Sequence, residues 1–129
     1  MKILVTGVSG QLGYDVVREG KLRGYEMIGS DVVGDVQCKL DITNRDLVME
    51  TVLDLRPHVI IHCGAFTAVD KAEEMKEVCW NVNVTGSTKL AIASKEVGAK
   101  LVYISTDYVF DGQGEIPYET DQIKSPLNY

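Results

Sequence analysis

The sequence predicts an α/β fold in which a doubly wound parallel sheet lies between two layers of helices, a three-layer αβα sandwich. Four short apolar runs and a short strand-like segment at residues 36–40 alternate along the chain with segments of helical periodicity. Strands and helices that alternate in this way form a parallel sheet with right-handed crossovers. With 129 residues, the chain builds one hydrophobic core rather than two.

The first predicted strand, residues 2–6, runs directly into a glycine-rich turn and then into a helix. Gly7 allows a tight turn out of the strand, Gly10 allows backbone N–H groups to approach a pyrophosphate, and Gly13 allows the helix to pack closely on the sheet. The unpaired N–H groups and the dipole at the start of the helix favour an anion there. The apolar face of this helix is predicted to comprise Leu12, Val16 and Val17.

A second apolar run, residues 27–30, ends at Asp31, eighteen residues after Gly13. A carboxylate in this position accepts hydrogen bonds from an adenosine ribose. The strand, the turn, the helix and the acidic residue together predict a Rossmann-type site for NAD(H) or NADP(H). A carboxylate repels a 2′-phosphate, which slightly favours NADH, although Lys39 or Arg45 nearby would offset that repulsion.

Residues 36–40 form the third predicted strand, which Asp41 and Ile42 close. Two interpretations of these residues stand. Either the carboxylate and the apolar side chain lie near an adenine, or Asp41 or Thr43 caps the next helix, predicted over residues 44–55.

The continuous apolar run at residues 59–63 predicts a fourth strand that is buried on both faces. Gly64 and Ala65 follow it, and such small residues leave room for a dinucleotide across the end of the strand. A loop then leads into a charged helix, for which Thr67 or Asp70 is the expected cap.

A long amphipathic helix is predicted over residues 81–97, ending at Gly98. Asn83 on this helix is either a hydrogen-bonding residue of the core or a brace for the active site. The buried stripe of the helix is predicted to comprise Val84, Leu90, Ala91, Ala93 and Val97.

The fifth strand is predicted at residues 100–105, so that Thr106 leaves its carboxyl end. Ligands of open α/β sheets bind outside the carboxyl ends of the strands, which places the Thr106 hydroxyl toward a substrate. Residues 111–129 have the composition of a loop and are a candidate lid.

The net charge of −6 argues against nucleic-acid or anionic-membrane partners, because both reward clustered cations. No apolar run approaches the roughly 20 residues of a membrane helix, and no signal peptide precedes the first strand. These features predict a cytoplasmic protein. Cys38, Cys63 and Cys79 have no zinc-binding spacing, so no metal site is expected, and His58 and His62 are interpreted as structural.

Four stretches resemble the extended short-chain dehydrogenase/reductases, and within them the branch of dTDP-4-dehydrorhamnose reductases. The stretches are VTGVSGQLG at residues 5–13, AFTAVDKAE at 65–73, STDYVFDG at 105–112 and SPLN at 125–128. The resemblance covers essentially the whole chain. It implies NAD(P)H-dependent reduction of the C4 ketone of dTDP-4-dehydro-L-rhamnose to dTDP-L-rhamnose, for polysaccharide biosynthesis, by an enzyme with a homodimer as its candidate assembly.

The resemblance also implies roles for individual residues. Thr106 matches the catalytic hydroxyl residue, and the segment on the substrate side comprises Asp107, Tyr108, Val109 and Phe110. The implied cofactor-binding residues are Gly7, Ser9, Gly10, Gln11, Leu12, Gly13, Asp31, Asp41, Ile42, Cys63, Gly64, Ala65 and Thr67.

In the family, a catalytic Tyr and a Lys four residues beyond it follow the PLN triplet. In that register Tyr129 is the variable residue before the catalytic Tyr, and with a shift of one residue Tyr129 is itself catalytic. Residues 1–129 are therefore expected to form an NAD(P)-binding domain that alone turns over slowly or not at all. The alternatives are another nucleotide-sugar epimerase, dehydratase or reductase of this family, and a non-catalytic dinucleotide-binding regulatory subunit.

Overall fold

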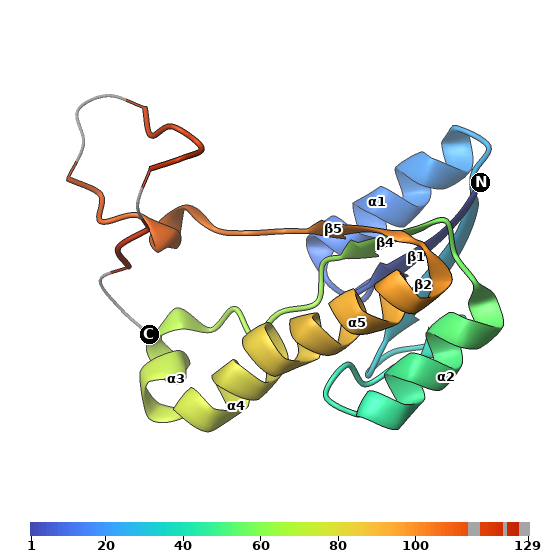
Figure 1. Ribbon diagram of the computed structural model, residues 1–129, viewed down its shortest axis with the longest axis horizontal. Helices are drawn as coiled ribbons and strands as arrows, with labels where there is room; N and C mark the ends of the chain where they lie inside the picture. The colour runs from blue at the N-terminus through green and yellow to red at the C-terminus, as the bar shows by residue number, and fades with distance from the viewer. Residues whose placement is uncertain (114–116, 123, 127–129) are drawn as a thin grey trace.

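A computed structural model of the chain describes residues 1–113, 117–122 and 124–126. Its centre is a five-stranded sheet with all four strand pairs parallel, in the order β3-β2-β1-β4-β5 (Figure 1). The strands are β1 (Lys2–Thr6), β2 (Glu26–Asp31), β3 (Cys38–Lys39), β4 (Val59–His62) and β5 (Lys100–Tyr103). The reversal of strand order between β1 and β4 confirms the predicted doubly wound fold.

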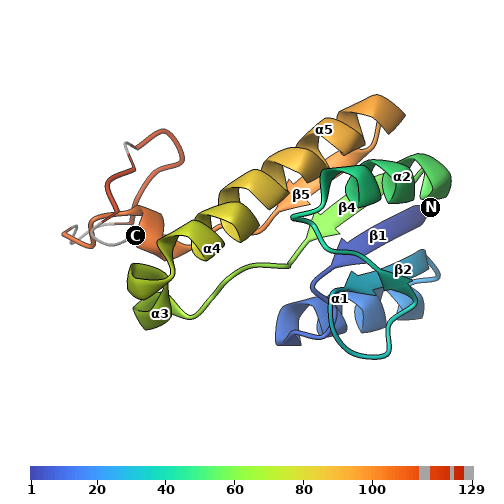
Figure 2. The same ribbon diagram turned by 90° about the horizontal axis from the view of Figure 1, so that it is seen from below.

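Helices cover the two faces of the sheet (Figure 2). α1 (Gln11–Leu22) lies on one face, and α2 (Arg45–Leu55) and α5 (Ser87–Val97) lie side by side on the other. Alternate strand residues point to opposite faces and build two apolar clusters. Leu4 and Ile60 belong to the cluster under α2 and α5, and Ile3 and Val5 to the smaller cluster under α1.

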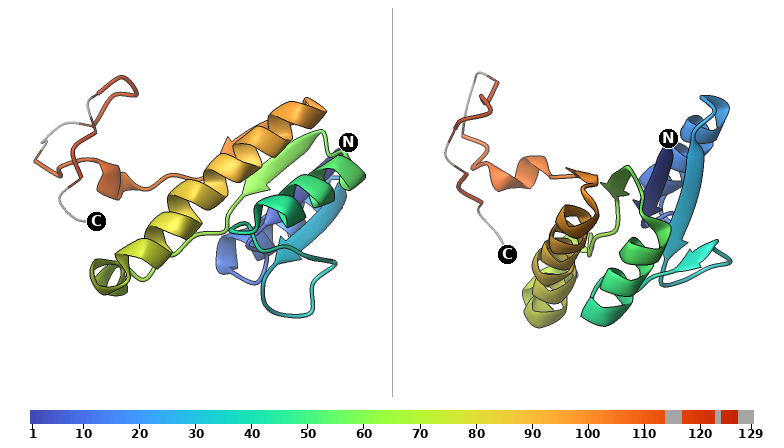
Figure 3. Two further views of the ribbon diagram at one scale, coloured as in Figure 1. Left: turned by 60° about the horizontal axis from the view of Figure 1, so that its bottom comes forward. Right: turned by 45° about the vertical axis from the view of Figure 1, so that its right-hand side comes forward.

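Three of the predicted elements are shorter or more exposed in the structure. β3 has two residues rather than five, and β5 ends at Tyr103 rather than at Ser105. Val59 and Ile61 of β4 are only half-buried, so the prediction that this strand is buried on both faces is wrong. The reason is that α1 packs on β1 and β2, and no other helix of the described residues lies on its face of the sheet (Figure 3).

The N-terminal caps of two helices differ from those predicted. The side chain of Asn44, rather than that of Asp41 or Thr43, caps α2 by accepting a hydrogen bond from the Leu47 N–H at 3.1 Å. α3 (Val69–Glu74) begins after Ala68 without a side-chain cap, so the caps predicted at Thr67 and Asp70 are wrong.

The predicted long helix is present but interrupted. α4 (Lys76–Trp80) continues through a π-helical turn, Asn81–Gly86, into α5, which ends at the left-handed Gly98. A π-turn inserts an extra residue and rotates the helix faces before it relative to those after it. Leu90 and Ala93 are buried as predicted and Val97 is half-buried, but Val84 and Ala91 are exposed.

Leu12 also departs from its predicted place in the core. Val16 and Val17 pack against the cluster under α1, whereas Leu12 is 47% exposed. Its position in the first turn of α1 carries it past the end of the sheet. After β5 the chain extends beyond the end of the sheet, on the side of α3 and α4 (Figure 1), with Thr106 followed by the short helix Asp107–Val109. The expectation of a lid in residues 111–129 stays a prediction.

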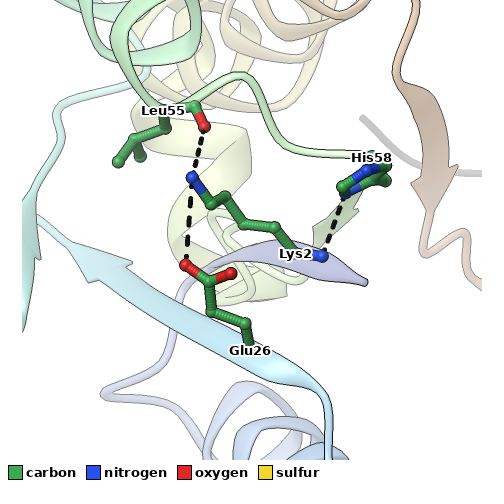
Figure 4. A network of polar contacts seen from close by, with 4 residues as sticks. All are labelled: Lys2, Glu26, Leu55 and His58. Carbon is green, nitrogen blue, oxygen red and sulfur yellow. Dashed lines mark hydrogen bonds and ion pairs between the residues drawn. The ribbon is translucent and has the colours of Figure 1, made fainter.

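At the amino end of the sheet, Lys2 joins three elements (Figure 4). Its Nζ donates to the Leu55 carbonyl at the end of α2 at 3.0 Å and lies 3.8 Å from a Glu26 carboxylate oxygen. Its backbone N–H donates to Nδ1 of the exposed His58 at 3.0 Å. Within the described residues, no helix combines the length and apolarity needed to cross a bilayer.

Candidate functional site

A cavity of about 1030 Å³ opens at the carboxyl ends of the strands. Its walls come from the glycine turn after β1, from the ends of β2 and β3, and from the segments that follow β4 and β5. The cavity therefore lies at the point where the strand order reverses, which is where open α/β sheets bind their ligands. Its volume exceeds that of most small-molecule sites, which run from about 300 to 1,000 Å³.

The three glycines of the turn have different neighbours. Gly7 has a φ of +75°, and a Cβ atom there would lie 2.5 Å from the Gly64 backbone nitrogen, so the turn crosses directly over the chain leaving β4. A Cβ at Gly13 would collide with the Gly7 carbonyl, so this glycine serves close packing within the turn rather than helix-to-sheet packing. At Gly10 the nearest atom would be the Gly7 carbonyl oxygen at 3.3 Å, which leaves the cavity side of Gly10 open.

The amino end of α1 faces this open space. Gly10 is its N-cap in extended conformation, and among the described side chains none accepts a hydrogen bond at this cap. The first turn, including Gln11 and Leu12, holds no acidic residue and lines the cavity. Unpaired N–H groups and a positive dipole end without a capping carboxylate form a site suited to a phosphate group.

Asp31 ties the turn to the end of β2. Its carboxylate accepts hydrogen bonds from three backbone N–H groups, those of Val32 at 2.7 Å, Ser9 at 3.0 Å and Val33 at 3.3 Å. A carboxylate has about four acceptor positions, so Asp31 keeps capacity for a further donor such as a ribose hydroxyl. Ser9 does not line the cavity; its Oγ donates to the Val33 carbonyl at 3.2 Å.

Asp41 and Ile42 lie beside Asp31 on the cavity wall. Asp41 Oδ1 accepts from the Thr43 N–H at 2.8 Å and from Thr43 Oγ1 at 2.7 Å, forming a turn before the cap of α2. Ile42 is only 8% exposed, because most of its side chain packs in the core under α2 and α5. The structure thus favours the cavity interpretation of Asp41 over the helix-cap interpretation.

The wall beyond β4 is formed by small residues and is held by Asn83. Cys63, Gly64, Ala65 and Thr67 all line the cavity, as does Asn83 itself. The Asn83 side chain makes two hydrogen bonds to the backbone of Phe66. Its Oδ1 accepts from the Phe66 N–H at 2.7 Å, and its Nδ2 donates to the Phe66 carbonyl at 3.1 Å. Of the two interpretations of Asn83, the structure favours the brace.

His62 ends β4 and lines the cavity directly before these residues, with 2% of its surface exposed. Its Nδ1 lies 2.6 Å from Thr6 Oγ1 and its Nε2 lies 3.0 Å from Ser87 Oγ. Burial lowers the pKa of the imidazole from 6.5 to about 4 and raises the pKa of the neighbouring Cys63 thiol. Both groups are therefore uncharged at neutral pH.

The segment after β5 closes the far side. Thr106 and Tyr108 line the cavity, whereas Asp107, Val109 and Phe110 do not. Thr106 Oγ1 accepts from the Tyr108 N–H and donates to an Asp107 carboxylate oxygen, each at 3.2 Å. Tyr129, the alternative catalytic residue, lies outside the described residues.

The structure brings together twelve of the thirteen residues predicted to bind a cofactor, Ser9 being the exception. It also adds Thr6 and His62 to the cavity wall, with Ser87 behind them. The only sequence signal for this group is that Thr6 and His62 each end an apolar strand. Within the described residues, no group of three His, Cys, Asp or Glu side chains is placed to hold a metal ion.

A family model described as RmlD substrate binding domain matches residues 1–129. The chain is 43% identical over 128 residues to dTDP-4-dehydrorhamnose reductase of Salmonella typhimurium strain LT2, a match that covers 99% of this chain and 42% of that enzyme. It is 38% identical over 130 residues to methionine adenosyltransferase 2 subunit beta of Xenopus laevis, covering 98% of this chain and 38% of that subunit.

Among solved structures, dTDP-4-dehydrorhamnose reductase from Bacillus anthracis str. Ames in complex with NADP matches with a TM-score of 0.91 and 41% identity. That match covers 98% of this chain and 44% of that chain. The chain therefore spans less than half the length of each of these relatives.

Proposed function

The chain belongs to the RmlD substrate-binding domain family, and from this premise we propose that it forms the dinucleotide-binding part of an NAD(P)H-dependent reductase. The substrate we propose is the C4 ketone of dTDP-4-dehydro-L-rhamnose, with dTDP-L-rhamnose as product. The family membership agrees with the resemblance predicted from the sequence. The observation that carries the proposal is the uncapped amino end of α1 above Gly10, facing a cavity of about 1030 Å³.

The cavity residues fit a dinucleotide in a definite order. The pyrophosphate would lie on the N–H groups at the start of α1, above Gly10, where no Cβ atom intrudes. The adenosine would lie toward Asp31, Asp41 and Ile42, and the nicotinamide would reach across Gly64 and Ala65 toward Thr106. The ordering follows from where each group lies along the carboxyl edge of the sheet.

When bound, the reduced dinucleotide supplies a hydride to the ketone carbon. The carbonyl oxygen then gains negative charge, which hydrogen-bond donors stabilise, and it takes up a proton to give the product hydroxyl. The catalytic Tyr that follows the PLN triplet in the family would donate that proton. Thr106 lines the cavity, and its hydroxyl would donate to that oxygen in place of its 3.2 Å hydrogen bond to Asp107. Tyr108, on the same wall, would contact the sugar.

We propose NADH as the slightly preferred cofactor because the Asp31 carboxylate lies at the adenosine end of the cavity. Three backbone N–H groups bind that carboxylate, which reduces its repulsion of a 2′-phosphate. Because the carboxylate would accept a hydrogen bond from the ribose of NADH, Asp31→Ala should weaken NADH binding more than NADPH binding. Equal losses for the two cofactors would contradict a ribose role for Asp31.

A second function is favoured by the 38% identity to methionine adenosyltransferase 2 subunit beta. In that case the chain would bind a dinucleotide as part of a regulatory subunit without acting on a sugar. Activity of the whole protein on the dTDP-sugar separates the two functions. We further propose a cytoplasmic location and a homodimer for the whole protein.

A titration of the chain with NADH and NADPH tests the proposal. Trp80 is 54% exposed and serves as a fluorescence donor. Saturable binding is expected for the wild type, and Gly10→Val should abolish it while the fold persists, because the added side chain would enter the open cavity. Binding by the Gly10→Val variant equal to that of the wild type would contradict the assignment of the glycine turn.

A further inference from the structure

Two hydroxyls and an imidazole form a chain of hydrogen bonds at the cavity wall, in which Thr6 and His62 line the cavity and Ser87 lies behind them. Thr6, His62 and Ser87 come from β1, β4 and the start of α5, and are joined through the two ring nitrogens of His62. Within the described residues, no buried side-chain nitrogen or oxygen lacks a hydrogen-bond partner. The hydroxyl protons of Thr6 and Ser87 and the ring proton of His62 can therefore each be assigned an acceptor.

The direction in which these hydrogen bonds run, from donor to acceptor, follows from the hydroxyl of Ser87. Ser87 Oγ donates its single proton to the Asn83 carbonyl at 2.7 Å, so toward His62 it can only accept. Nε2 of His62 must then carry the ring proton, which leaves Nδ1 as an acceptor for the Thr6 hydroxyl. The Thr6 oxygen in turn accepts from the Gly64 N–H at 3.4 Å.

Both ends of this series of hydrogen bonds reach residues of the cavity wall. At one end is Gly64, over which Gly7 crosses so closely that no Cβ atom fits. At the other end is Asn83, whose side chain holds the backbone of Phe66. Ser87 itself does not line the cavity. The two parts of the wall thus share one neutral connection, which is buried at Thr6 and His62 and half-buried at Ser87.

We propose that His62, as its neutral Nε2–H tautomer, is a positioning residue that couples Ser87 and Asn83 to the floor of the dinucleotide site at Thr6 and Gly64. The proposal rests on the proposed dinucleotide-binding function. His62 acts through its two hydroxyl partners; its side chain is buried, and the ring of Tyr103 lies 5.8 Å away between centroids.

The neighbouring residues Ser87 and Thr88 provide a matched pair of variants. Both hydroxyls donate to a helix carbonyl four residues earlier, at 2.7 and 2.8 Å, but only Ser87 also contacts His62. Ser87→Ala should weaken NADPH and NADH binding about fivefold, as expected for one lost hydrogen bond of the chain. Thr88→Ala should leave both dissociation constants within about twofold of the wild type.

A double-mutant cycle shows whether Ser87 acts through His62. In His62→Asn the shorter side chain reaches toward Thr6 but not toward Ser87, so Ser87→Ala should have no additional effect in that background. An unchanged dissociation constant for folded Ser87→Ala overturns the coupling. An equal weakening in both backgrounds overturns the role of His62.

The tautomer of His62 is measured on the wild type, so that no variant needs to fold. Proton–nitrogen correlation spectra of the imidazole at pH 7 should show a neutral ring with its proton on Nε2. A proton on Nδ1, or a cationic ring, overturns the proposed direction. If the folded wild type binds neither dinucleotide, the proposed function fails and the coupling to it fails as well; binding by the wild type without an effect of Ser87→Ala contradicts the coupling alone.

Discussion

His58, directly before β4, and His62, the last residue of β4, lie at the two ends of the sheet, and their surroundings differ in exposure and in hydrogen bonding. His58, at the amino end, is exposed and accepts one backbone hydrogen bond, beside a lysine that reaches a carboxylate only at 3.8 Å. His62, at the carboxyl end, is buried and uses both ring nitrogens. The short strand β4 therefore connects a solvated end of the sheet, with charged side chains, to an end with neutral, buried hydrogen bonds.

This difference shows what a ligand site in a doubly wound sheet needs. Exposed charges exchange protein partners for water at little cost, so they hold backbone segments only loosely. Buried neutral groups lose the whole hydrogen bond when a partner moves, so they hold backbone segments in one arrangement. The carboxyl end has the second kind of contact, and it is the end that carries the cavity.

The largest expected contrast between the ends comes from two glycines with the same backbone conformation. Gly7 and Gly24 have φ values of +75° and +76°, but a Cβ at Gly7 would lie 2.5 Å from the Gly64 nitrogen and one at Gly24 would meet no described atom within 4 Å. Gly24→Ala should lower the free energy of unfolding by about 1 kcal/mol, and Gly7→Ala by about 3 kcal/mol or more. Urea denaturation measures both, and equal losses would contradict the close crossing at Gly64.

A comparable effect is expected from acid. The folded-state pKa of His62 lies near 4 and its ordinary value is 6.5. Between these two pH values the imidazole is protonated in the unfolded protein and neutral in the folded protein. The stability contributed by the neutral ring is complete above pH 6.5 and is lost as the pH falls toward 4, by roughly 3 kcal/mol. Unfolding curves at several pH values should show this slope in the wild type and a smaller one in His62→Asn; equal slopes would contradict the assignment.

The hydrogen bonds of Asn83 should contribute less to the free energy of unfolding than Gly7 or the neutral ring of His62. Asn83→Ala leaves the N–H and carbonyl of Phe66 without their partners, and should lower the free energy of unfolding by about 1–2 kcal/mol and weaken dinucleotide binding. Asn81, exposed on the same π-helical turn, provides the control: Asn81→Ala should change the stability by less than about 0.5 kcal/mol. Similar losses for the two variants would show that Asn83 matters only for the helix.

The smallest effect is expected at the amino end. Lys2→Met removes a hydrogen bond to the Leu55 carbonyl and a 3.8 Å ion pair with Glu26, whose side chain is 63% exposed. The free energy of unfolding should fall by about 0.5–1 kcal/mol, without a change in dinucleotide binding. A weakened affinity for NADPH in this variant would contradict the separation of the two ends.

The strands, glycine turn and helix from Lys2 to Asp31 could be predicted from the sequence because local rules fix them, although the places of Ser9, Leu12 and Gly13 could not. A β-branched run, a glycine turn and an amphipathic helix each leave a pattern within a few residues. The left-handed Gly98 is of the same kind. Helix caps were harder to predict, because Asp41, Thr43 and Asn44 are all good N-caps and only the geometry of the turn selects Asn44.

The hydrogen-bonded chain around His62 could not be predicted, because it depends on strand register. Thr6 and His62 are partners across β1 and β4, although 56 residues separate them. The place of Ser87 depends in addition on the π-helical turn before it, and one inserted residue leaves no signal in the hydrophobic pattern. Contacts of this kind come from the tertiary structure alone.

Amide chemical-shift mapping of the chain with NADPH tests the central claim most directly. Binding at the carboxyl end predicts that the shifted amides belong to the glycine turn, Asp31, Gly64 and Thr106, while those of Glu26, Gly24 and His58 stay unchanged. Shifts concentrated at the amino end, or no shifts at saturating NADPH in a folded sample, would contradict the account.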